Sequence, residues 1–337
     1  MSNNRRWELA AHGRQHLSQV QASRPVPGTG EVLVAVEAVS LNYRDHLIVE
    51  NGLGTDWTFP LVPGTDLAGR VVETGAGVTR FAVGDRVISN DIAGWVDGDA
   101  PTEDTNRATI VGRLAEYVVV DAQQLVAAPS SLDAVQASTL PCAALTAWMA
   151  VVELAHVRAG QTLVVQGTGG VALFAVQFAL AHGARVIVTS SGQAKLDRLA
   201  TLGPVEGIDR SRHPDWQHEV LRLTQGRGAD HILEMAGGDN LGRSLEAVRV
   251  GGRISMIGLL GGNHFSGPTG LMLYKRATIA GIGVGSRRVL EDMVRAIDAL
   301  QLKPVIDAAY DFDALPQALA HLERGAFGKV VVKVGTP

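Results

Sequence analysis

Residues 161–191 read QTLVVQGTGGVALFAVQFALAHGARVIVTSS. The short apolar run Thr162–Gln166 predicts a buried strand, and a glycine-rich turn follows it directly. Residues 171–181 are apolar almost all round, as expected of a helix that packs on a sheet. The β-branched run Arg185–Val188 predicts a second strand. Strand, turn, helix and strand in this order predict a βαβ unit.

The glycine turn has the pattern Gly167-x-Gly169-x-x-Ala172. Glycines let the backbone turn tightly and approach a pyrophosphate, and the free N–H groups of the following helix face the anion. The position between a strand and a helix makes this pattern more specific than the glycines alone. An ordinary glycine-rich turn is the alternative. The candidate cofactor contacts in the turn are Gly167, Thr168, Gly169, Gly170 and Val171.

The end of the second strand bears on which nicotinamide cofactor binds. An NAD site usually places Asp or Glu on the ribose about 20 residues after the glycines, whereas this chain has Ser190 and Ser191 there. A carboxylate 4 Å from a 2′-phosphate would cost about 4 kcal/mol at an effective dielectric near 20. We therefore expect NADP(H), with Ser190, Ser191 and Lys195 near the phosphate. The alternative is that Lys195 and Arg198 are only solvated helix charges.

Composition excludes several classes of partner. The chain has 337 residues, is 46% hydrophobic and 19% charged, and has a net charge of −4, which fits an ordinary globular protein without a broad basic surface. We expect no nucleic-acid or membrane partner, because no apolar run is long enough to span a bilayer. The single cysteine, Cys142, excludes an internal disulfide and makes a cytoplasmic location the expectation.

Two domains follow from the order of the predicted elements. The first third has short strands with frequent turns, which predicts a compact β-rich domain. Residues 132–156 have helical spacing interrupted by Pro141, and strands then alternate with helices up to a strand at Thr278–Val284 and a helix at Val289–Leu300. Strand-like runs at 305–309 and 329–334 are expected to return to the first domain. The prediction is an α/β protein with a β-rich domain at 1–127 and 305–337 and a doubly wound parallel-sheet cofactor domain at 128–304.

Several motifs follow one another along nearly the whole chain. They are PGTGEVLV (27–34), SLNYRD (40–45), PGTDLAG (63–69), FAVGDRV (81–87), AEY (115–117), LPCAALTAW (140–148), the glycine turn and residues 251–258. In this order they resemble the medium-chain dehydrogenase/reductase family, in its zinc-free branch with quinone oxidoreductases and enone reductases. The resemblance implies a GroES-like catalytic domain, a Rossmann domain, hydride transfer in the cleft between them, and a homodimer paired through the strand predicted at Thr278–Val284.

The resemblance also shows where a catalytic zinc would bind in metal-dependent members of the family. Zinc-dependent members of the family carry Cys at the position of Asn42 and Gly-His-Glu at the position of Gly64-Thr65-Asp66, whereas their third ligand position falls near Cys142. A catalytic zinc needs three protein ligands, and one thiol does not supply them. We therefore expect no metal, and Cys142 is interpreted as a small buried residue.

Without a Lewis acid, a carbonyl must be polarised by hydrogen bonds. Asn42 and Tyr43 are the candidate catalytic residues, by their place in NYRD. The alternative is that Asn42 braces a turn and Tyr43 packs against its neighbours. Asp45 is expected to hold the local backbone, and Arg44 to be a surface charge.

Further cofactor contacts are expected from position and resemblance. Gly258, Leu259 and Leu260 leave a predicted strand at its carboxyl end, where ligands of open α/β sheets bind. Ser286 and Arg287 follow another predicted strand, with a structural role as the alternative. Thr146 resembles a family residue that faces the nicotinamide, and Lys329 resembles a family lysine near the cofactor, although a surface lysine that begins a strand is the alternative.

The sequence thus predicts an NADP(H)-dependent, zinc-independent oxidoreductase that transfers a hydride to a quinone or an α,β-unsaturated carbonyl compound. Two alternatives remain. One is an alcohol dehydrogenase or carbonyl reductase of the same fold, and the other is a non-catalytic NADPH-binding protein.

Overall fold

The structure of the protein is a computed structural model that describes residues 3–54, 56–101, 112–262 and 264–335. The chain divides into two units, and each is described by itself. The first contains residues 1–145 and 284–337, and the second contains residues 146–283. Within the described residues, no helix is long and apolar enough to cross a membrane.

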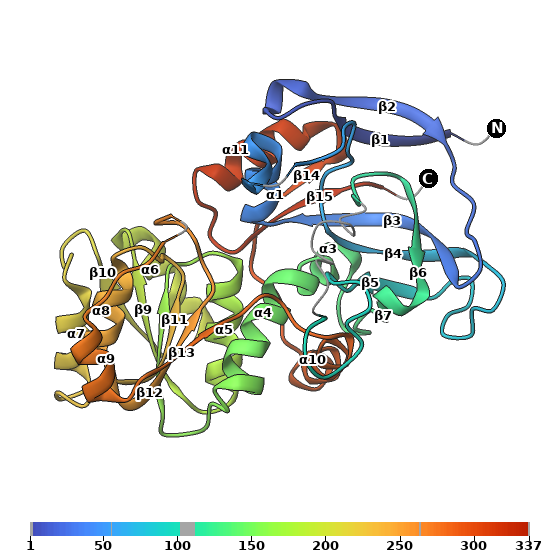
Figure 1. Ribbon diagram of the computed structural model, residues 1–337. Coiled ribbons are helices and arrows are strands. Elements are labelled where there is room, and N and C mark those ends of the chain that lie inside the picture. The colour runs from blue at the N-terminus through green and yellow to red at the C-terminus, as the bar shows by residue number, and fades with distance from the viewer. Residues whose placement is uncertain (1–2, 55, 102–111, 263, 336–337) are drawn as a thin grey trace. The chain divides into compact units, whose positions relative to one another are not determined.

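The second unit is built on a parallel six-stranded sheet with strand order β10-β9-β8-β11-β12-β13 (Figure 1). The sequence order reverses between β8 and β11, which is the point where an open sheet of this kind binds its ligand. The strands are β8 (Thr162–Gln166), β9 (Arg185–Ser190), β10 (Val205–Asp209), β11 (Ala229–Glu234), β12 (Val248–Met256) and β13 (Thr278–Gly281). The helices are α5 (Gly170–Ala181), α6 (Gln193–Leu199), α7 (Trp216–Leu223), α8 (Asn240–Ala247) and α9 (Thr269–Lys275).

The sequence patterns of β8 and α5 explain why they form the centre of this unit. All five residues of β8 are buried, as the apolar run predicts for a strand covered on both faces. Helix α5 packs on β8 and β9 and buries most of its residues, including Phe174 and Phe178. The predicted βαβ unit is therefore confirmed.

The first unit is built on a second, mostly antiparallel sheet. Seven strands take part in the order β14-β15-β3-β4-β5-β7, and β6 pairs with β3. They are β3 (Glu31–Leu41), β4 (Asp66–Thr74), β5 (Arg86–Ser89), β6 (Tyr117–Asp121), β7 (Leu125–Ala127), β14 (Ile306–Asp311) and β15 (Lys329–Lys333). A separate hairpin joins β1 (Asn3–Leu9) to β2 (Leu17–Ser23), and the helices include α1 (Tyr43–Asn51), α3 (Ala134–Ala137), α10 (Arg287–Leu300) and α11 (Leu315–Glu323).

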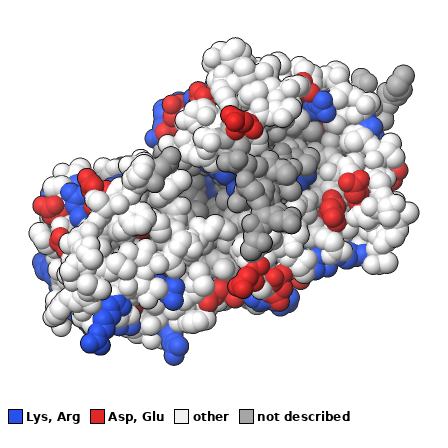
Figure 2. All heavy atoms as spheres, viewed as in Figure 1, with Lys and Arg blue, Asp and Glu red and all other residues white. Residues whose placement is uncertain are grey.

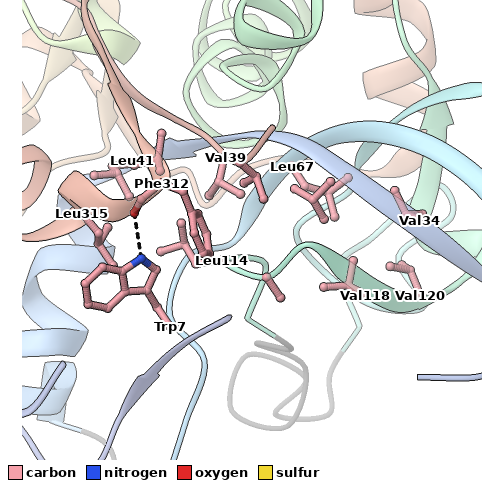
Figure 3. Packing of buried hydrophobic residues seen from close by; sticks show 14 of the residues in the cluster. Trp7, Val34, Val39, Leu41, Leu67, Leu114, Val118, Val120, Phe312 and Leu315 are labelled. Atoms are coloured by element: carbon pink, nitrogen blue, oxygen red, sulfur yellow. Dashed lines mark hydrogen bonds between the residues drawn. The ribbon is translucent and has the colours of Figure 1, made fainter. Parts of the chain in front are cut away.

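Both ends of the chain contribute to the core of the first unit. Trp7 donates its indole N–H to the backbone oxygen of Phe312 at 2.9 Å, and the two rings meet edge to face (Figure 3). Strand β15 pairs with β3, so the expected return of residues 305–309 and 329–334 to the first domain is confirmed. The buried cluster continues through Val39, Leu67 and Leu114.

The structure refines two sequence-based expectations about secondary structure. Residues 132–156 are largely helical with an interruption near Pro141, as expected, but the segment is divided: α3 is followed by a π-helical turn at Leu140–Ala144, α4 (Leu145–Trp148) and a second π-helical turn at Met149–Leu154. The strand expected at Thr278–Val284 ends at Gly281, because Val284 has a positive φ of 54° that a strand does not allow.

The unit boundaries differ from those expected at 127/128 and 304/305. Helix α10 belongs with the first unit, because it packs on β7 and its Asp298 accepts hydrogen bonds from the backbone N–H groups of Ser130 and Ser131 at 3.0 and 2.9 Å. No local sequence pattern indicates this pairing, because α10 follows the strands of the second unit's sheet directly in the chain.

A buried carboxylate joins the carboxyl ends of β8 and β11 in the second unit. Glu234 is fully buried and accepts hydrogen bonds from the side chains of Gln166, Asn240 and Ser244. Its Oε1 also accepts from the backbone N–H groups of residues 236–237, both at 3.0 Å. This network fixes the loops that begin where the two strands end, at the reversal of strand order.

We expect Glu234→Ala to lower the free energy of unfolding by about 3 kcal/mol, because several buried donors lose their acceptor together. Urea denaturation of the wild type and the variant measures the difference. Glu234→Gln keeps one acceptor oxygen and should cost less. Equal stability of all three proteins would contradict this role of the carboxylate.

His231 lies in the middle of the same sheet. It is 8% exposed, and within the described part of the chain neither ring nitrogen has a hydrogen-bond partner. Burial lowers the pKa of His231 to about 4, and the charge of Asp230 opposes this shift only in part. The folded protein therefore keeps this imidazole neutral at pH values where an unfolded chain would protonate it.

The sign of the resulting pH dependence follows from the lowered pKa of His231. Between pH 6.5 and 4 only the unfolded state binds this proton, so stability is lost as the pH falls through that range. We expect the free energy of unfolding of the wild type, minus that of His231→Leu, to fall by about 2 to 3 kcal/mol from pH 7.5 to 4. Denaturation at several pH values measures it, and a difference independent of pH would show that His231 titrates normally.

Candidate functional site

The glycine turn of the second unit leaves room for a ligand. Gly167 has a φ of +84°, which favours glycine, and a Cβ added at Gly167 or Gly169 would meet no atom within 4 Å. Gly169 is the N-cap of α5 and supplies no side chain, so the first N–H groups of the helix, at Gly170 and Val171, lack a capping acceptor. Thr168 is buried in the turn.

The turn lies against the end of β9, where the phosphate contacts were expected. Gly167 donates its backbone N–H to the oxygen of Thr189 at 2.7 Å. The hydroxyls of Thr189 and Ser190 are buried and have no hydrogen-bond partner among the described residues. Ser191 is exposed, and Lys195 lies on α6, which begins two residues later. Unpaired buried hydroxyls beside an open glycine turn fit the ribose and phosphate of a dinucleotide.

Gly258, Leu259 and Leu260 follow β12 at its carboxyl end. A Cβ at Gly258 would lie 1.8 Å from the backbone oxygen of Met235, so the loop after β12 approaches the loop after β11 as closely as only glycine allows. Leu259 and Leu260 expose 52% and 63% of their surface. Thr146, in α4, is buried in the same unit. Among the predicted cofactor contacts, the structure brings the glycine turn and the carboxyl end of β9 together. These two segments are the main reason why the second unit fits a dinucleotide.

In the first unit, Asn42 is the N-cap of α1, directly after β3. The carboxylate of Asp45 accepts a hydrogen bond from the backbone N–H of Asn42 at 2.7 Å, so Asp45 holds the local backbone as expected. Asn42 Oδ1 accepts a hydrogen bond from Lys329 Nζ at 2.6 Å. Asn42 Nδ2 is buried and makes no hydrogen bond of normal geometry with any described residue. The side chain therefore presents an unused amide donor.

Lys329 and Asp66 form the ionic part of this site. Lys329 is 3% exposed, and its Nζ lies 3.8 Å from Oδ2 of the fully buried Asp66. Burial raises the pKa of Asp66 to about 7, whereas the charge of Lys329 acts to lower it. The amide of Asn42 lies close enough to Asp66 to favour the charged carboxylate as well. Lys329 is therefore a buried side chain, and the alternative of a surface lysine is wrong.

Arg44 and Asp91 are site residues that the sequence analysis missed. The guanidinium of Arg44 donates to both carboxylate oxygens of Asp91, at 2.8 and 2.6 Å, and to Thr65 Oγ1 at 3.1 Å. Arg44 was expected at the surface, but it is held in this bidentate pair with a buried carboxylate. Arg113 is also buried near Asp91, and burial lowers the pKa of its guanidinium to about 10. No local pattern in the sequence marked these pairings.

Tyr43 and Cys142 lie in the same unit. Tyr43 is 44% exposed, and its ring centroid lies 5.6 Å from that of His46. Cys142 is half-buried, so the expectation of a buried residue is wrong in degree. Desolvation and the charge of Asp66 both raise the pKa of its thiol. Within the described ranges, no three His, Cys, Asp or Glu side chains are grouped so that they could hold a metal ion.

Ser286 and Arg287 have structural contacts in the first unit. Ser286 caps α10, since its hydroxyl accepts a hydrogen bond from the backbone N–H of Val289 at 3.4 Å. Arg287 donates to the side chain of Gln123 and lies 3.5 Å from Glu291. These contacts correspond to the structural alternative that the sequence left open.

Two family models match the chain. One is described as the alcohol dehydrogenase GroES-like domain and matches residues 28–130, and the other is described as zinc-binding dehydrogenase and matches residues 170–301. A zinc-type alcohol dehydrogenase-like protein of Schizosaccharomyces pombe is 38% identical over 90% of this chain and 91% of its own length. The quinone oxidoreductase of Pongo abelii is 27% identical over 91% of this chain and 90% of its own length.

Solved structures agree with these matches. A structure from Sinorhizobium meliloti 1021, provisionally described as an alcohol dehydrogenase, is 51% identical, covers 99% of this chain and 100% of its own, and has a TM-score of 0.94. An NAD-dependent alcohol dehydrogenase is 32% identical, covers 98% of this chain and 100% of its own, and has a TM-score of 0.86. Similarity over both units, together with the GroES-like and parallel-sheet architectures, shows that the chain belongs to the medium-chain dehydrogenase/reductase superfamily of alcohol dehydrogenase- and quinone oxidoreductase-like enzymes, which use a nicotinamide cofactor.

Proposed function

We propose that the chain is an NADPH-dependent, zinc-independent oxidoreductase that reduces a quinone or an α,β-unsaturated carbonyl compound. One observation carries this proposal. The buried amide of Asn42 offers an unused Nδ2 donor, while its oxygen is held by the ammonium of Lys329. Such a donor suits an oxygen that gains negative charge during a reduction.

The proposed reduction requires two things of the chain: a hydrogen-bond donor for the carbonyl oxygen, which is Asn42 Nδ2, and a binding site for the cofactor. When bound, the reduced nicotinamide supplies a hydride. Asn42 Nδ2 donates a hydrogen bond to the carbonyl oxygen, which becomes an enolate or phenolate oxygen as the hydride adds to the conjugated system. Tyr43, the next residue and partly exposed, is the second candidate donor.

The preference for NADPH rests on the end of β9. Ser190 and Ser191 stand where an NAD site would carry an acid, and the hydroxyl of Ser190 is a buried, unpaired group. We assign the cofactor contacts to the glycine turn, to Ser190, Ser191 and Lys195, and to the loop of residues 258–260. Thr146 belongs to the proposed contact set by its resemblance to a family residue, and Ser286 and Arg287 by their position after a strand.

Zinc independence is supported by the side chains at the positions that hold zinc in metal-dependent members of the family. Asn42 and Thr65 are poor zinc ligands, which leaves the thiol of Cys142 and the carboxylate of Asp66. Three protein ligands are needed, so these positions favour catalysis by hydrogen bonds.

The proposal includes a cytoplasmic homodimer. β13 is the outermost strand of the second unit's sheet, so its free edge suits pairing with a second copy. On the face shown in Figure 2, acidic and basic residues are interspersed, a pattern that suits a small uncharged substrate better than a polyanion. An alcohol dehydrogenase or carbonyl reductase is the second candidate, favoured by the names of several relatives.

Turnover tests the function directly. We expect the protein to oxidise NADPH with 1,4-benzoquinone or 2-cyclohexenone, at a rate that EDTA does not change. Asn42→Ala should lower kcat about 100-fold, because the developing oxyanion loses its donor. Tyr43→Phe is the matched variant and should change kcat much less.

Three results would contradict parts of this proposal. Loss of activity in EDTA that zinc restores would exclude the zinc-independent mechanism. Full activity of Asn42→Ala, with a slow Tyr43→Phe, would move the donor to Tyr43, whereas turnover of simple alcohols alone would favour the dehydrogenase alternative.

The cofactor preference has its own test at the exposed Ser191. We expect Ser191→Asp to lower kcat/KM for NADPH at least 10-fold, because a carboxylate near the 2′-phosphate costs about 4 kcal/mol before screening by salt. The value for NADH should not fall. Steady-state kinetics with both cofactors measures this, and the uncharged Ser191→Asn is the control. A wild type that prefers NADH would refute the assignment of the phosphate site.

A further inference from the structure

A primary amide can present either its oxygen or its NH₂ group to a ligand, and the two ends have opposite polarity. Asn42 can stabilise a developing oxyanion only if Nδ2 is the end that faces the substrate. We propose that Lys329 is a positioning residue that fixes the orientation of the Asn42 amide and increases the polarity of its N–H donors. This inference rests on the proposed function and assigns Lys329 a role other than cofactor contact.

The fold brings the two residues together from opposite ends of the chain. Strand β15 is antiparallel to β3, with Val330 opposite Leu41. Lys329 precedes Val330 and Asn42 follows Leu41, so the register places them opposite each other at the end of the ladder. Their side chains meet there, with Nζ and Oδ1 2.6 Å apart.

The chemistry of the two groups sets the orientation of the amide. An ammonium carries donors only, so it accepts no hydrogen bond and can face only the oxygen end of the amide. Lys329 is 3% exposed and Asn42 is 8% exposed, so water does not compete freely for this contact. The amide oxygen is thereby occupied. Nδ2 lies near the carboxylate of Asp66 but makes no hydrogen bond of normal geometry with a described residue, so it can donate to a substrate oxygen.

Neighbouring acids keep the lysine in place. Asp66 Oδ2 lies 3.8 Å from Lys329 Nζ, and the carboxylate of Asp45 accepts a hydrogen bond from the backbone N–H of Asn42. A cation bonded to an amide oxygen withdraws electrons from the nitrogen and strengthens its N–H donors, as in other charge-assisted hydrogen bonds. Lys329 thus acts on the substrate through Asn42.

A double-mutant cycle tests this role. We expect Lys329→Met to lower kcat for enone reduction 10- to 100-fold in the wild-type background. The same substitution should change kcat less than 2-fold in an Asn42→Ala background, because its effect passes through Asn42. KM for the enone should change much less than kcat, and the Kd for NADPH, from fluorescence titration, should stay within 2-fold.

Three further variants serve as controls for this experiment. Lys333 lies on the same strand, and its side chain is 48% exposed. The substitution Lys333→Met should leave kcat, KM and the Kd for NADPH unchanged. Lys329→Arg keeps the charge and donor and should recover part of the lost kcat. Lys329→Gln replaces Lys329→Met in the cycle if the latter does not fold in a thermal denaturation assay.

The outcomes separate this inference from the proposed function. Wild-type protein that reduces no quinone or enone refutes the proposed function, and this inference with it. Active wild type with equal effects of Lys329→Met in both backgrounds overturns only the positioning role. A Kd for NADPH raised more than 10-fold, with kcat unchanged at saturating NADPH, would instead make Lys329 a cofactor contact.

Discussion

The pairing of β15 with β3 is the constraint on which the first unit depends. It joins residues near the end of the chain to a strand that begins at Glu31, and it extends the sheet by β15 and β14. The same return of the chain brings Phe312 to Trp7 in the core. Lys329 reaches Asn42 only because this ladder fixes its register, so one strand pairing supports both the packing and the polar centre of the unit.

The second unit relies on a different device. Its parallel strands end together, and the loops that follow them must be held without regular secondary structure. Glu234 does this with one buried carboxylate that accepts hydrogen bonds from three side chains and two backbone N–H groups. The glycine turn beside it stays open because its N–H groups have no capping side chain. A preorganised dinucleotide site needs loops that are held rigidly beside a turn whose backbone N–H groups can bind the ligand.

Local patterns predicted much of this structure. The apolar run of β8, the glycine turn and the apolar helix α5 each carry their signal within a few residues, and the fold class followed from them. The pairing of Asn42 with Lys329 spans 287 residues, and that of Arg44 with Asp91 spans 47, so no window of the sequence contains either. The π-helical turns around Trp148 were missed for another reason: their spacing of apolar residues resembles that of an α-helix, and only the hydrogen bonds differ.

The discontinuity of the first unit has a consequence for synthesis on the ribosome. The whole of residues 146–283 emerges before β14 and β15, so the second unit can complete its sheet while the first still lacks two strands. Until residues 306–333 leave the exit tunnel, residues 38–41 of β3 lack the strand that pairs with them, whereas residues 31–35 already have β6 as a partner. The nascent chain therefore carries a short unpaired strand edge while the second unit is synthesised, and such an edge is a site at which other chains or chaperones bind.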